Sequence, residues 1–314
     1  MSDSIHFVYA VDKNYNHQLL ISINSLLSKF TGKAIIHIIH KDAKSIEKQL
    51  KKIQSYENLE QINVYQFIKD SNSFPNIEGT HISEATYYRL FINKYIPDDI
   101  DSYIYLDADI ICLNDAYEKI NKTFSVLKKS NYKVAARTEM QRETNELKFS
   151  SLGIKGTTYF NAGVLFVNNK LWRKEEVYDG LLVHLEKIKD RLEFWDQDVL
   201  NSFFEGYYLE IEDGLNNGLD LSKPTKNNQG TFSSTIFLHY QGSNKPWSIQ
   251  GSLHSGSKYY HSEYNKFFDK KYHIKSRYSK GDLIILFRIL FSGRIFSLKY
   301  PFMFFYYSLK AILR

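Results

Sequence analysis

Two carboxylates placed one residue apart are the residues of this chain best suited to chemistry. They lie toward the C-terminal end of residues 103–111, a run of aromatic and β-branched residues that predicts a buried strand. Side chains two apart in an extended chain point the same way, so Asp107 and Asp109 are expected to converge at the carboxyl edge of a sheet. Converging carboxylates suit Mn²⁺ or Mg²⁺, which completes its shell with substrate phosphates. The alternative is an ordinary strand that ends in a polar turn.

A second group of polar residues follows an expected strand over residues 236–239. His239 could be a third metal ligand, Gly242 would leave room for a phosphate, and Lys245 would neutralise it. A lone histidine at a strand end is more often structural. The short loop that follows this histidine also contains Gly, Lys, Pro and Trp, and this combination favours a binding site.

The turn after the first expected strand contains no glycine, so the Gly-rich loop that often cradles a diphosphate is absent there. Asp12, Asn14 and Tyr15 could instead hold a base by hydrogen bonds and stacking. Ordinary turn chemistry of Asp and Asn is the alternative.

Three further positions have both a functional and a structural interpretation. Arg89 lies in an expected helix and is either a site residue or a surface residue with a buried stem. The small residues from Asn161 to Gly163 open a strand, where they would admit a ligand or a neighbouring helix. Asp196 lies in the first turn of a helix, which favours acids through the helix dipole as well as a catalytic role.

The elements that position these residues alternate between strand and helix, which predicts an α/β fold with a mainly parallel sheet. Strands are expected over residues 5–11, 34–40, 62–67, 103–111, 131–136, 159–167 and 236–239. Helices are expected over residues 17–30, 45–56, 83–95, 171–189 and 194–205, with Ser83 as an N-cap. The polar residues 137–156 are expected to form a flexible flap.

Length and composition predict one large domain with an appendage. The chain has 314 residues, 43% of them hydrophobic, and one cysteine, Cys112, so no intramolecular disulfide can form. This fits a reducing compartment. The first residues have neither the basic nor the apolar region of a secretory signal, and no N-terminal anchor is expected.

The positive charge is concentrated at the C-terminal end. From Lys266 onward eleven bases face two acids, a net +9, while the whole chain has a formal charge of +6 and the preceding part therefore −3. Bulky apolar and aromatic clusters alternate with these bases, and none is long enough to span a bilayer. The pattern predicts an anionic membrane surface as partner rather than nucleic acid, with packing on the core or an oligomer contact as the alternative.

Six motifs occur in a specific order along the chain. They are Ala10-Val11-Asp12-x-Asn14-Tyr15, His81-Ile82-Ser83 with Arg89, Tyr105-Leu106-Asp107-x-Asp109, Tyr159-Phe160-Asn161-Ala162-Gly163, Asp196-Gln197-Asp198 and His239-Tyr240-x-Gly242-x-x-Lys245-Pro246-Trp247. Over roughly the first four-fifths of the chain this set resembles glycosyltransferase family 8, especially its bacterial lipopolysaccharide and lipooligosaccharide galactosyl- and glucosyltransferases.

The resemblance implies a GT-A fold, a UDP-sugar donor, Mn²⁺ with Mg²⁺ as the alternative, and transfer with retention of configuration. It implies Asp107, Asp109 and His239 as metal ligands, and a nucleotide-sugar site made by Ala10, Asp12, Asn14, Tyr15, Arg89, Ala108, Asn161, Ala162, Asp196, Gln197, Gly242 and Lys245. Arg89, Asp196 and Gln197 would take catalytic positions at the donor sugar. His81, Phe194 and Trp247 would border the acceptor, although relatives with a galactosyl acceptor carry a polar aromatic residue in place of Phe194.

The favoured hypothesis is a retaining UDP-hexose transferase that acts on a membrane-associated glycan at the cytoplasmic face of the membrane. Its catalytic domain would span residues 1–257, and a membrane-association segment residues 258–314. A nucleotidyltransferase is a second enzymatic hypothesis, but it usually has a Gly-rich loop near its N-terminus. A non-catalytic sugar-nucleotide-binding membrane protein is a third, and extension of a protein-linked glycan also remains open.

Overall fold

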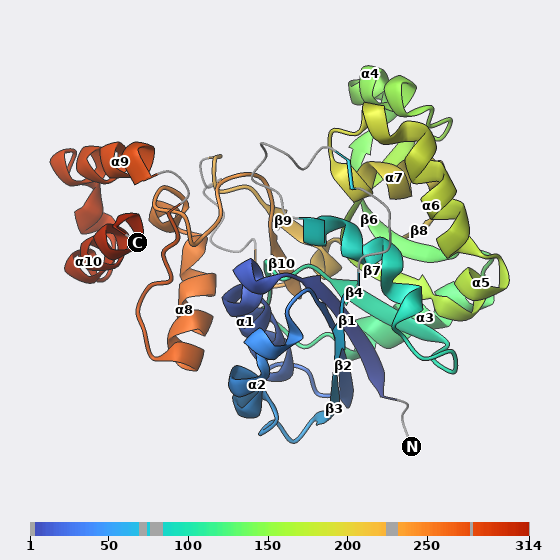
Figure 1. The fold of residues 1–314 in the computed structure, drawn as a ribbon, viewed down its shortest axis with the longest axis horizontal. Helices are drawn as coiled ribbons and strands as arrows, with labels where there is room; N and C mark the ends of the chain where they lie inside the picture. Colours follow the sequence, from blue (N-terminus) through green and yellow to red (C-terminus); the bar gives the residue numbers. More distant parts are fainter. Residues whose placement is uncertain (1–3, 69–73, 76–83, 224–231, 277–278, 314) are drawn as a thin grey trace.

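The computed structural model describes residues 4–68, 74–75, 84–223, 232–276 and 279–313. Its centre is a seven-stranded sheet in the order β3-β2-β1-β4-β7-β6-β8 (Figure 1). The strands are β1 (Ile5–Val11), β2 (Ala34–His40), β3 (Leu59–Gln66), β4 (Ser102–Leu106), β6 (Val134–Gln141), β7 (Thr158–Asn168) and β8 (Leu209–Glu210). The first four run parallel, and β7 pairs antiparallel with both β4 and β6. The predicted α/β class with a mainly parallel sheet is confirmed.

Helices cover both faces of this sheet. One core cluster joins the sheet to α1 (Asn16–Leu27), α2 (Glu47–Ile53) and α3 (Tyr117–Lys129). The other joins it to the 3-10 helix η3 (Glu84–Lys94) and to α4 (Arg142–Leu152), α6 (Val177–Ile188) and α7 (Trp195–Phe204). Because both faces are covered, the central strands are largely buried, and nine of the eleven residues of β7 are buried. The outer strand β3 is partly exposed and carries several polar residues.

A smaller sheet brings the C-terminal part of the catalytic region to the end of β4. It has the order β5-β10-β9, with β5 (Ile110–Cys112), β10 (Phe237–Tyr240) and β9 (Asn217–Leu219). The strand β10 pairs antiparallel with β5, so that His239 faces Ile110 in register. This pairing places the histidine beside the two carboxylates, although they lie 130 residues apart in sequence.

Three expectations about elements need correction. The supposed flap over residues 137–156 is ordered, because β6 continues to Gln141 and is followed at once by α4. The expected helix over 171–189 is two helices, α5 (Asn169–Lys174) and α6, separated where Glu176 adopts a positive φ of 50°. The expected helix over 83–95 is present from Glu84 but as a 3-10 helix, and Ser83 lies outside the described residues.

The C-terminal part divides into two structural pieces. Helix α8 (Ser257–Phe268) packs on α1, and its Tyr260 and Tyr264 belong to a core cluster with Trp247. Helices α9 (Ser279–Phe291) and α10 (Pro301–Ile312), joined by η7 (Arg294–Ser297), form a separate cluster beyond α8 (Figure 1). Helix α8 begins at Ser257, next to the boundary expected at residues 257/258, and packs on α1. The division of the chain at this point stays a prediction.

In the part of the chain that the structure describes, no helix combines the length and the hydropathy needed to cross a bilayer.

Candidate active site

The two carboxylates meet where predicted, but a turn rather than an extended strand brings them together. β4 ends at Leu106, and residues 107–109 form the turn that leads into β5. The Asp107 backbone N–H donates to the Gly163 carbonyl at 2.8 Å, and its Oδ1 accepts from the Tyr105 hydroxyl at 2.6 Å. The turn is therefore tied to both β4 and β7.

His239 completes a group of three potential metal ligands. One ligand atom from each of Asp107, Asp109 and His239 lies within 4.8 Å of the others. The His239 Nδ1 lies 3.0 Å from Oδ1 of Asn216, which can only accept, so Nδ1 carries the proton. His239 Nε2 is thereby left with a lone pair, 3.3 Å from Asp109 Oδ1 and 3.8 Å from Asp107 Oδ2. An imidazole oriented by an amide oxygen is a typical metal-ligand arrangement.

Gly163 makes room for this histidine. A Cβ at Gly163 would fall 2.8 Å from Nδ1 and 2.9 Å from Nε2 of His239, closer than real Cβ atoms come. The approach of a ligand along Asn161 and Ala162 stays a prediction, whereas the role of Gly163 is set by His239. Gly163 itself accommodates the imidazole ring.

The electrostatics around Asp109 suit a cation. Asp109 Oδ2 pairs with Lys245 Nζ at 2.8 Å, whereas the buried Oδ1 makes no hydrogen bond with the described residues. Burial acts to raise the pKa of Asp109, but the charge of Lys245 opposes this effect, and the pKa is lowered. A buried, ionised oxygen beside the Nε2 lone pair fits a divalent ion, with Asp107, Asp109 and His239 as its ligands.

Arg89 links the carboxylate turn to helix α7. Its Nη2 lies 3.4 Å from Asp107 Oδ1, its Nε pairs with Asp196, and its Nη1 donates to the Ala162 carbonyl. The side chain is only 9% exposed, so the surface interpretation of Arg89 was wrong. Burial raises the pKa of Asp196 to about 7 against the effect of Arg89, because one guanidinium is shared by two carboxylates.

Gln197 lies beside Asp196 and holds the small step of β7. Its Oε1 accepts from the Ala162 N–H at 2.9 Å, and its Nε2 donates to Glu139 Oε2 at 2.9 Å. Asn161 also donates to Glu139, at 3.3 Å, so that this exposed carboxylate is held by two predicted site residues.

The predicted base-binding turn is ordered by its own side chains. Asp12 accepts from the backbone N–H of Asn14 at 2.8 Å and from its amide at 3.3 Å. The Tyr15 ring meets the buried Trp247 edge to face, with ring centroids 6.0 Å apart. Trp247 is 4% exposed, and its predicted acceptor contact stays a prediction.

The sequence model of glycosyl transferase family 8 matches residues 6–251, which contain every described site residue named above. The chain belongs to this family. Two family relatives act on lipopolysaccharide by name. The chain is 29% identical over 259 residues to the lipopolysaccharide 1,3-galactosyltransferase of Salmonella typhimurium, which covers 80% of this chain and 75% of that protein. It is 25% identical over 278 residues to a lipopolysaccharide 1,2-glucosyltransferase of Escherichia coli, covering 84% and 78%.

A solved structure confirms the GT-A fold expected for this family 8 protein. The galactosyltransferase LgtC, solved with donor and acceptor sugar analogs, aligns with a TM-score of 0.67 at 23% identity. The alignment covers 83% of this chain and 96% of that one.

The structure describes most of the remaining predicted positions of this family 8 glycosyltransferase. Gly242 adopts a φ of +74° in the loop after β10, a conformation that favours glycine. Phe194 precedes α7 and is 41% exposed, with Lys148 Nζ 4.4 Å from its ring centroid. Ala10 and Ala108 are buried beside the predicted nucleotide residues. His81 lies outside the described residues.

Three polar residues of the site were not singled out from the sequence. Asn216 orients His239 and also donates to Asn161 Oδ1 at 3.0 Å. Glu139 and Tyr105 contact Gln197 and Asp107. Asn216 lies in a polar stretch that reads as an ordinary loop, and nothing in its spacing indicates a metal site.

Proposed function

We propose that this family 8 glycosyltransferase is a retaining, Mn²⁺-dependent hexosyltransferase, with Mg²⁺ as the alternative ion. It would move galactose or glucose from a UDP-sugar to lipopolysaccharide, lipooligosaccharide or another membrane-associated glycan. The observation that carries this proposal is the convergence of Asp107, Asp109 and His239 beside Lys245 and the Arg89–Asp196 pair.

The charges of this cluster support a metal and a diphosphate. Three carboxylates, those of Asp107, Asp109 and Asp196, surround two cations, Arg89 and Lys245. A divalent ion held by the two turn carboxylates and His239 would neutralise charge on the diphosphate leaving group. Lys245 reaches the same point and would add a second positive charge when a phosphate replaces Asp109 as its partner.

The Arg89–Asp196 pair is placed to orient the donor sugar. Both side chains are buried, and Arg89 connects the metal turn with the first turn of α7. The carboxylate of Asp196 has a raised pKa and is held in place by the guanidinium of Arg89. It can therefore accept a hydrogen bond from a sugar hydroxyl. These contacts support a role for Asp196 and Arg89 at the sugar rather than at the nucleotide.

The contacts of Gln197 support retention by a front-face route. Its Oε1 already accepts the Ala162 N–H, and an amide is a poor nucleophile. In the front-face route the bond from the anomeric carbon to the β-phosphate oxygen breaks while the acceptor oxygen forms the new bond on the same face. The acceptor proton passes to an oxygen of the departing UDP, so no enzyme nucleophile is required.

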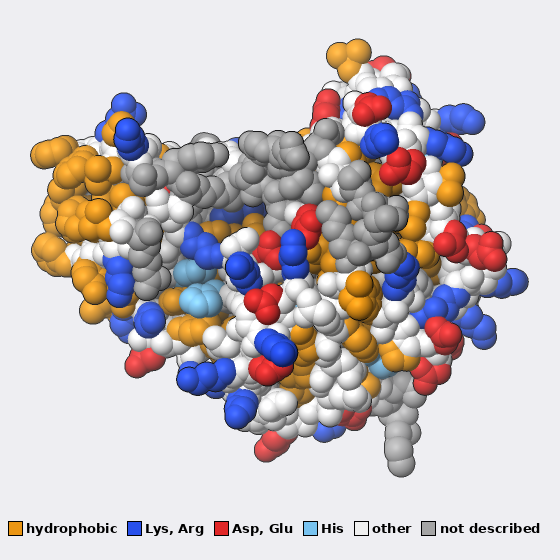
Figure 2. All heavy atoms as spheres, viewed as in Figure 1, with side chains coloured by type: hydrophobic (Ala, Val, Ile, Leu, Met, Phe, Trp, Pro, Cys, Tyr) orange, Lys and Arg blue, Asp and Glu red, His pale blue; other side chains and the backbone are white. Residues whose placement is uncertain are grey.

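The C-terminal helices support action at a membrane surface. Their exposed side chains include Ile284, Phe287, Phe291, Phe296, Phe302, Met303, Tyr306 and Leu313. Figure 2 shows hydrophobic side chains gathered over α9 and α10, with Lys and Arg nearby. On this proposal the enzyme is peripheral on the cytoplasmic face of the membrane, and nucleic acid is not a partner.

A donor panel tests the proposal. The full chain is incubated with UDP-galactose, UDP-glucose and other UDP-sugars in the presence of Mn²⁺ or excess chelator, and UDP release is measured. We expect turnover of one hexose donor that is lost on chelation and restored best by Mn²⁺. Asp109→Asn should lower this rate by several orders of magnitude while the melting temperature stays close to that of the parent, because charge is lost without a change of shape.

Each alternative predicts a distinct outcome. Donor binding without turnover in any metal would indicate a non-catalytic sugar-nucleotide-binding protein. Full turnover in excess chelator would contradict the metal site. Donor hydrolysis with transfer only to glycosylated peptides would replace the lipid-linked acceptor by a protein-linked glycan.

A further inference from the structure

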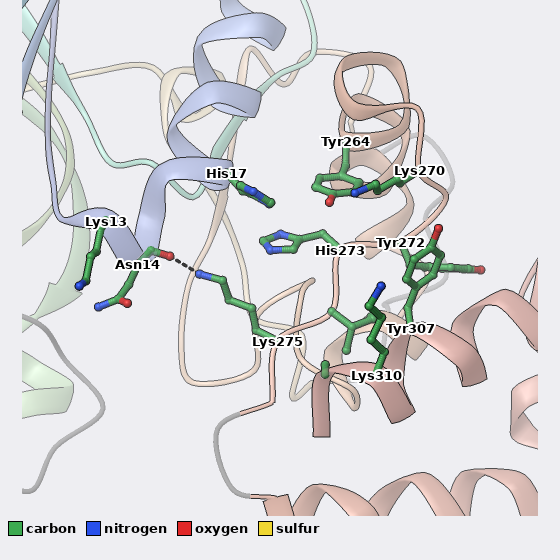
Figure 3. A pocket seen from close by; sticks show the side chains of 12 residues that line it. Lys13, Asn14, His17, Tyr264, Lys270, Tyr272, His273, Lys275, Tyr307 and Lys310 are labelled. Carbon is green, nitrogen blue, oxygen red and sulfur yellow. Dashed lines mark hydrogen bonds between the residues drawn. The ribbon is translucent and has the colours of Figure 1, made fainter. Parts of the chain in front are cut away.

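A basic cavity lies away from the carboxylate turn, between the N-terminal end of α1 and the C-terminal helices, and shares Asn14 with the predicted base-binding turn. Its volume is about 290 Å³. It is lined by His17 of α1, by Lys270, His273 and Lys275 after α8, and by Tyr307 and Lys310 of α10, among others (Figure 3). Elements from both ends of the chain therefore build it.

The cavity is positively charged. Four lysines line it, and no Asp or Glu is among the described lining residues. Lys13, Lys270 and Lys310 form no ion pair with a carboxylate of the described chain. Figure 3 shows Lys13 at the rim, Lys270 beside Tyr264, and Lys310 reaching from α10 toward the loop of Tyr272 and His273.

Two neighbouring histidines lie in the positive electrostatic field of these lysines. The ring centroids of His17 and His273 are 4.9 Å apart. Burial, then Lys275 and Lys270, lower the pKa of His17 to about 4, and burial followed by His17 and Lys275 lowers that of His273. Nδ1 of His17 is buried and makes no hydrogen bond within the described chain. Neutral imidazoles beside lysine ammonium groups suit an anion with several acceptor oxygens.

We propose that this cavity binds a phosphate group, supplied either by the headgroup of an anionic lipid or by a soluble phosphate. This ligand is separate from the donor and the acceptor of the proposed transfer reaction. The lipid source is favoured by α10, because this helix contributes Tyr307 and Lys310 to the cavity while Phe302 and Met303 are exposed. A headgroup phosphate in the cavity would fix how the apolar helices sit on the membrane.

Two double variants of the full chain separate a built site from diffuse charge. Lys270→Ala/Lys310→Ala removes two bases that line the cavity. Lys280→Ala/Lys299→Ala removes the same charge from exposed positions of the C-terminal part that do not line it. Flotation with phosphatidylcholine vesicles, with and without phosphatidylglycerol, measures the lipid arm. Titration with inorganic phosphate at constant ionic strength, with UDP and Mn²⁺ present to occupy the donor site, measures the soluble arm.

For a lipid headgroup we expect the cavity variant to lose about thirtyfold in affinity for phosphatidylglycerol vesicles. The control variant should lose less than about threefold. For a soluble phosphate we expect the cavity variant alone to lose binding of inorganic phosphate, with vesicle affinity equal in both variants. Equal behaviour of the two variants in both arms would overturn the proposal. Melting temperatures of both variants should match the parent, and the imidazole NMR signals of the parent should shift when the phosphate probe binds.

Discussion

Three amide and imidazole side chains connect the proposed sugar site with the proposed metal site. Asn161 accepts from Asn216, and Asn216 accepts from Nδ1 of His239. This chain fixes which nitrogen of His239 faces the carboxylates, so that the metal-facing atom is a lone pair rather than an N–H. The position of a side chain one contact away from the ligands therefore determines whether the ligand set is usable.

We predict that Asn216→Ala lowers Mn²⁺ affinity by about tenfold to a hundredfold, the usual effect of losing such a partner. The variant releases the His239 ring, which can then rotate or protonate Nε2. Titration followed by electron paramagnetic resonance measures the affinity. Asn217→Ala is the matched control, because the neighbouring Asn217 donates to Thr235 instead, at 2.7 Å. Equal affinities of the two variants would show that Asn216 does not orient the ligand.

At the scale of elements, β7 and β10 approach so closely that one position of β7 has to be glycine. The His239 ring of β10 occupies the space where a Cβ of Gly163 would lie. Strand β7 is buried on both faces and pairs with β4 and β6, so it cannot move away to relieve a clash. The histidine is the part that would have to shift.

We predict that Gly163→Ala abolishes Mn²⁺ binding and UDP-sugar turnover while the protein still folds. The added methyl group displaces the His239 imidazole from the carboxylates by more than its Nε2 can tolerate as a ligand. Mn²⁺ titration and circular dichroism of the same sample check the two parts. A variant that keeps parental Mn²⁺ affinity would rule out His239 as a ligand.

A second element-scale contact makes stability depend on pH. Helix α8 is held to the loop after β10 by buried His261, whose Nε2–H donates to the Pro246 carbonyl at 2.9 Å. Burial lowers the pKa of His261 to about 4, against an ordinary value of 6.5. The unfolded chain thus binds a proton more readily than the folded one, so stability is present above pH 6.5 and is lost as pH falls toward 4.

We predict that, when the pH falls from about 7 to about 5, the unfolding free energy of the parent decreases by about 2 kcal/mol more than that of His261→Gln. Glutamine can donate to Pro246 but does not titrate. Urea unfolding of the parent and the variant at both pH values gives the difference, and the other buried histidines cancel in it. The idea fails if both proteins lose the same unfolding free energy.

The sequence predicts elements and site residues to different degrees. The strand that leads to Asp107 and the strand that contains His239 were predicted, because apolar and β-branched runs leave few alternatives. The single strand expected over residues 103–111 was wrong, because the turn at 107–109 divides it into β4 and β5. The partner of Gly163 could not be predicted, because it depends on the pairing of β10 with β5, and strand pairing is a long-range property. The sequence also did not predict that residues 137–156 are ordered. A polar, partly exposed helix such as α4 has no strong apolar period that would indicate it.

At the scale of the whole molecule, the C-terminal helices form an apolar body at one end of the protein (Figure 1). Phe291 and Phe302 are 84% and 81% exposed, an unusual exposure for phenylalanine. Leu147 is 89% exposed on α4, and Figure 1 shows this helix on the side of the central sheet opposite to α9 and α10. The chain thus offers a matched pair of exposed apolar positions, one inside and one outside the proposed membrane-facing part.

We predict that Phe291→Ser/Phe302→Ser weakens binding to phosphatidylglycerol vesicles by about 3 kcal/mol, because two phenyl rings no longer enter the interface. Leu147→Ser should leave binding unchanged. High salt should weaken the parent through its basic residues without releasing it completely. Flotation at low and high salt measures all three proteins. If the double variant floats like the parent, the apolar body serves another purpose, such as an oligomer contact.

One contact joins the two ends of the molecule. Lys275, which lines the basic cavity, donates to the backbone carbonyl of Asn14 in the turn predicted to bind the base. If a phosphate in the cavity draws Lys275 toward itself, the free energy of that shift is shared with the turn. Such coupling is reciprocal, so an anion that alters donor affinity by some factor is itself bound more or less tightly by the same factor when the donor is present. Binding at the cavity and binding at the nucleotide turn would then form a thermodynamic cycle. In this cycle, binding to a membrane surface changes the affinity for the sugar nucleotide, and the sugar nucleotide changes the affinity for the surface by the same factor.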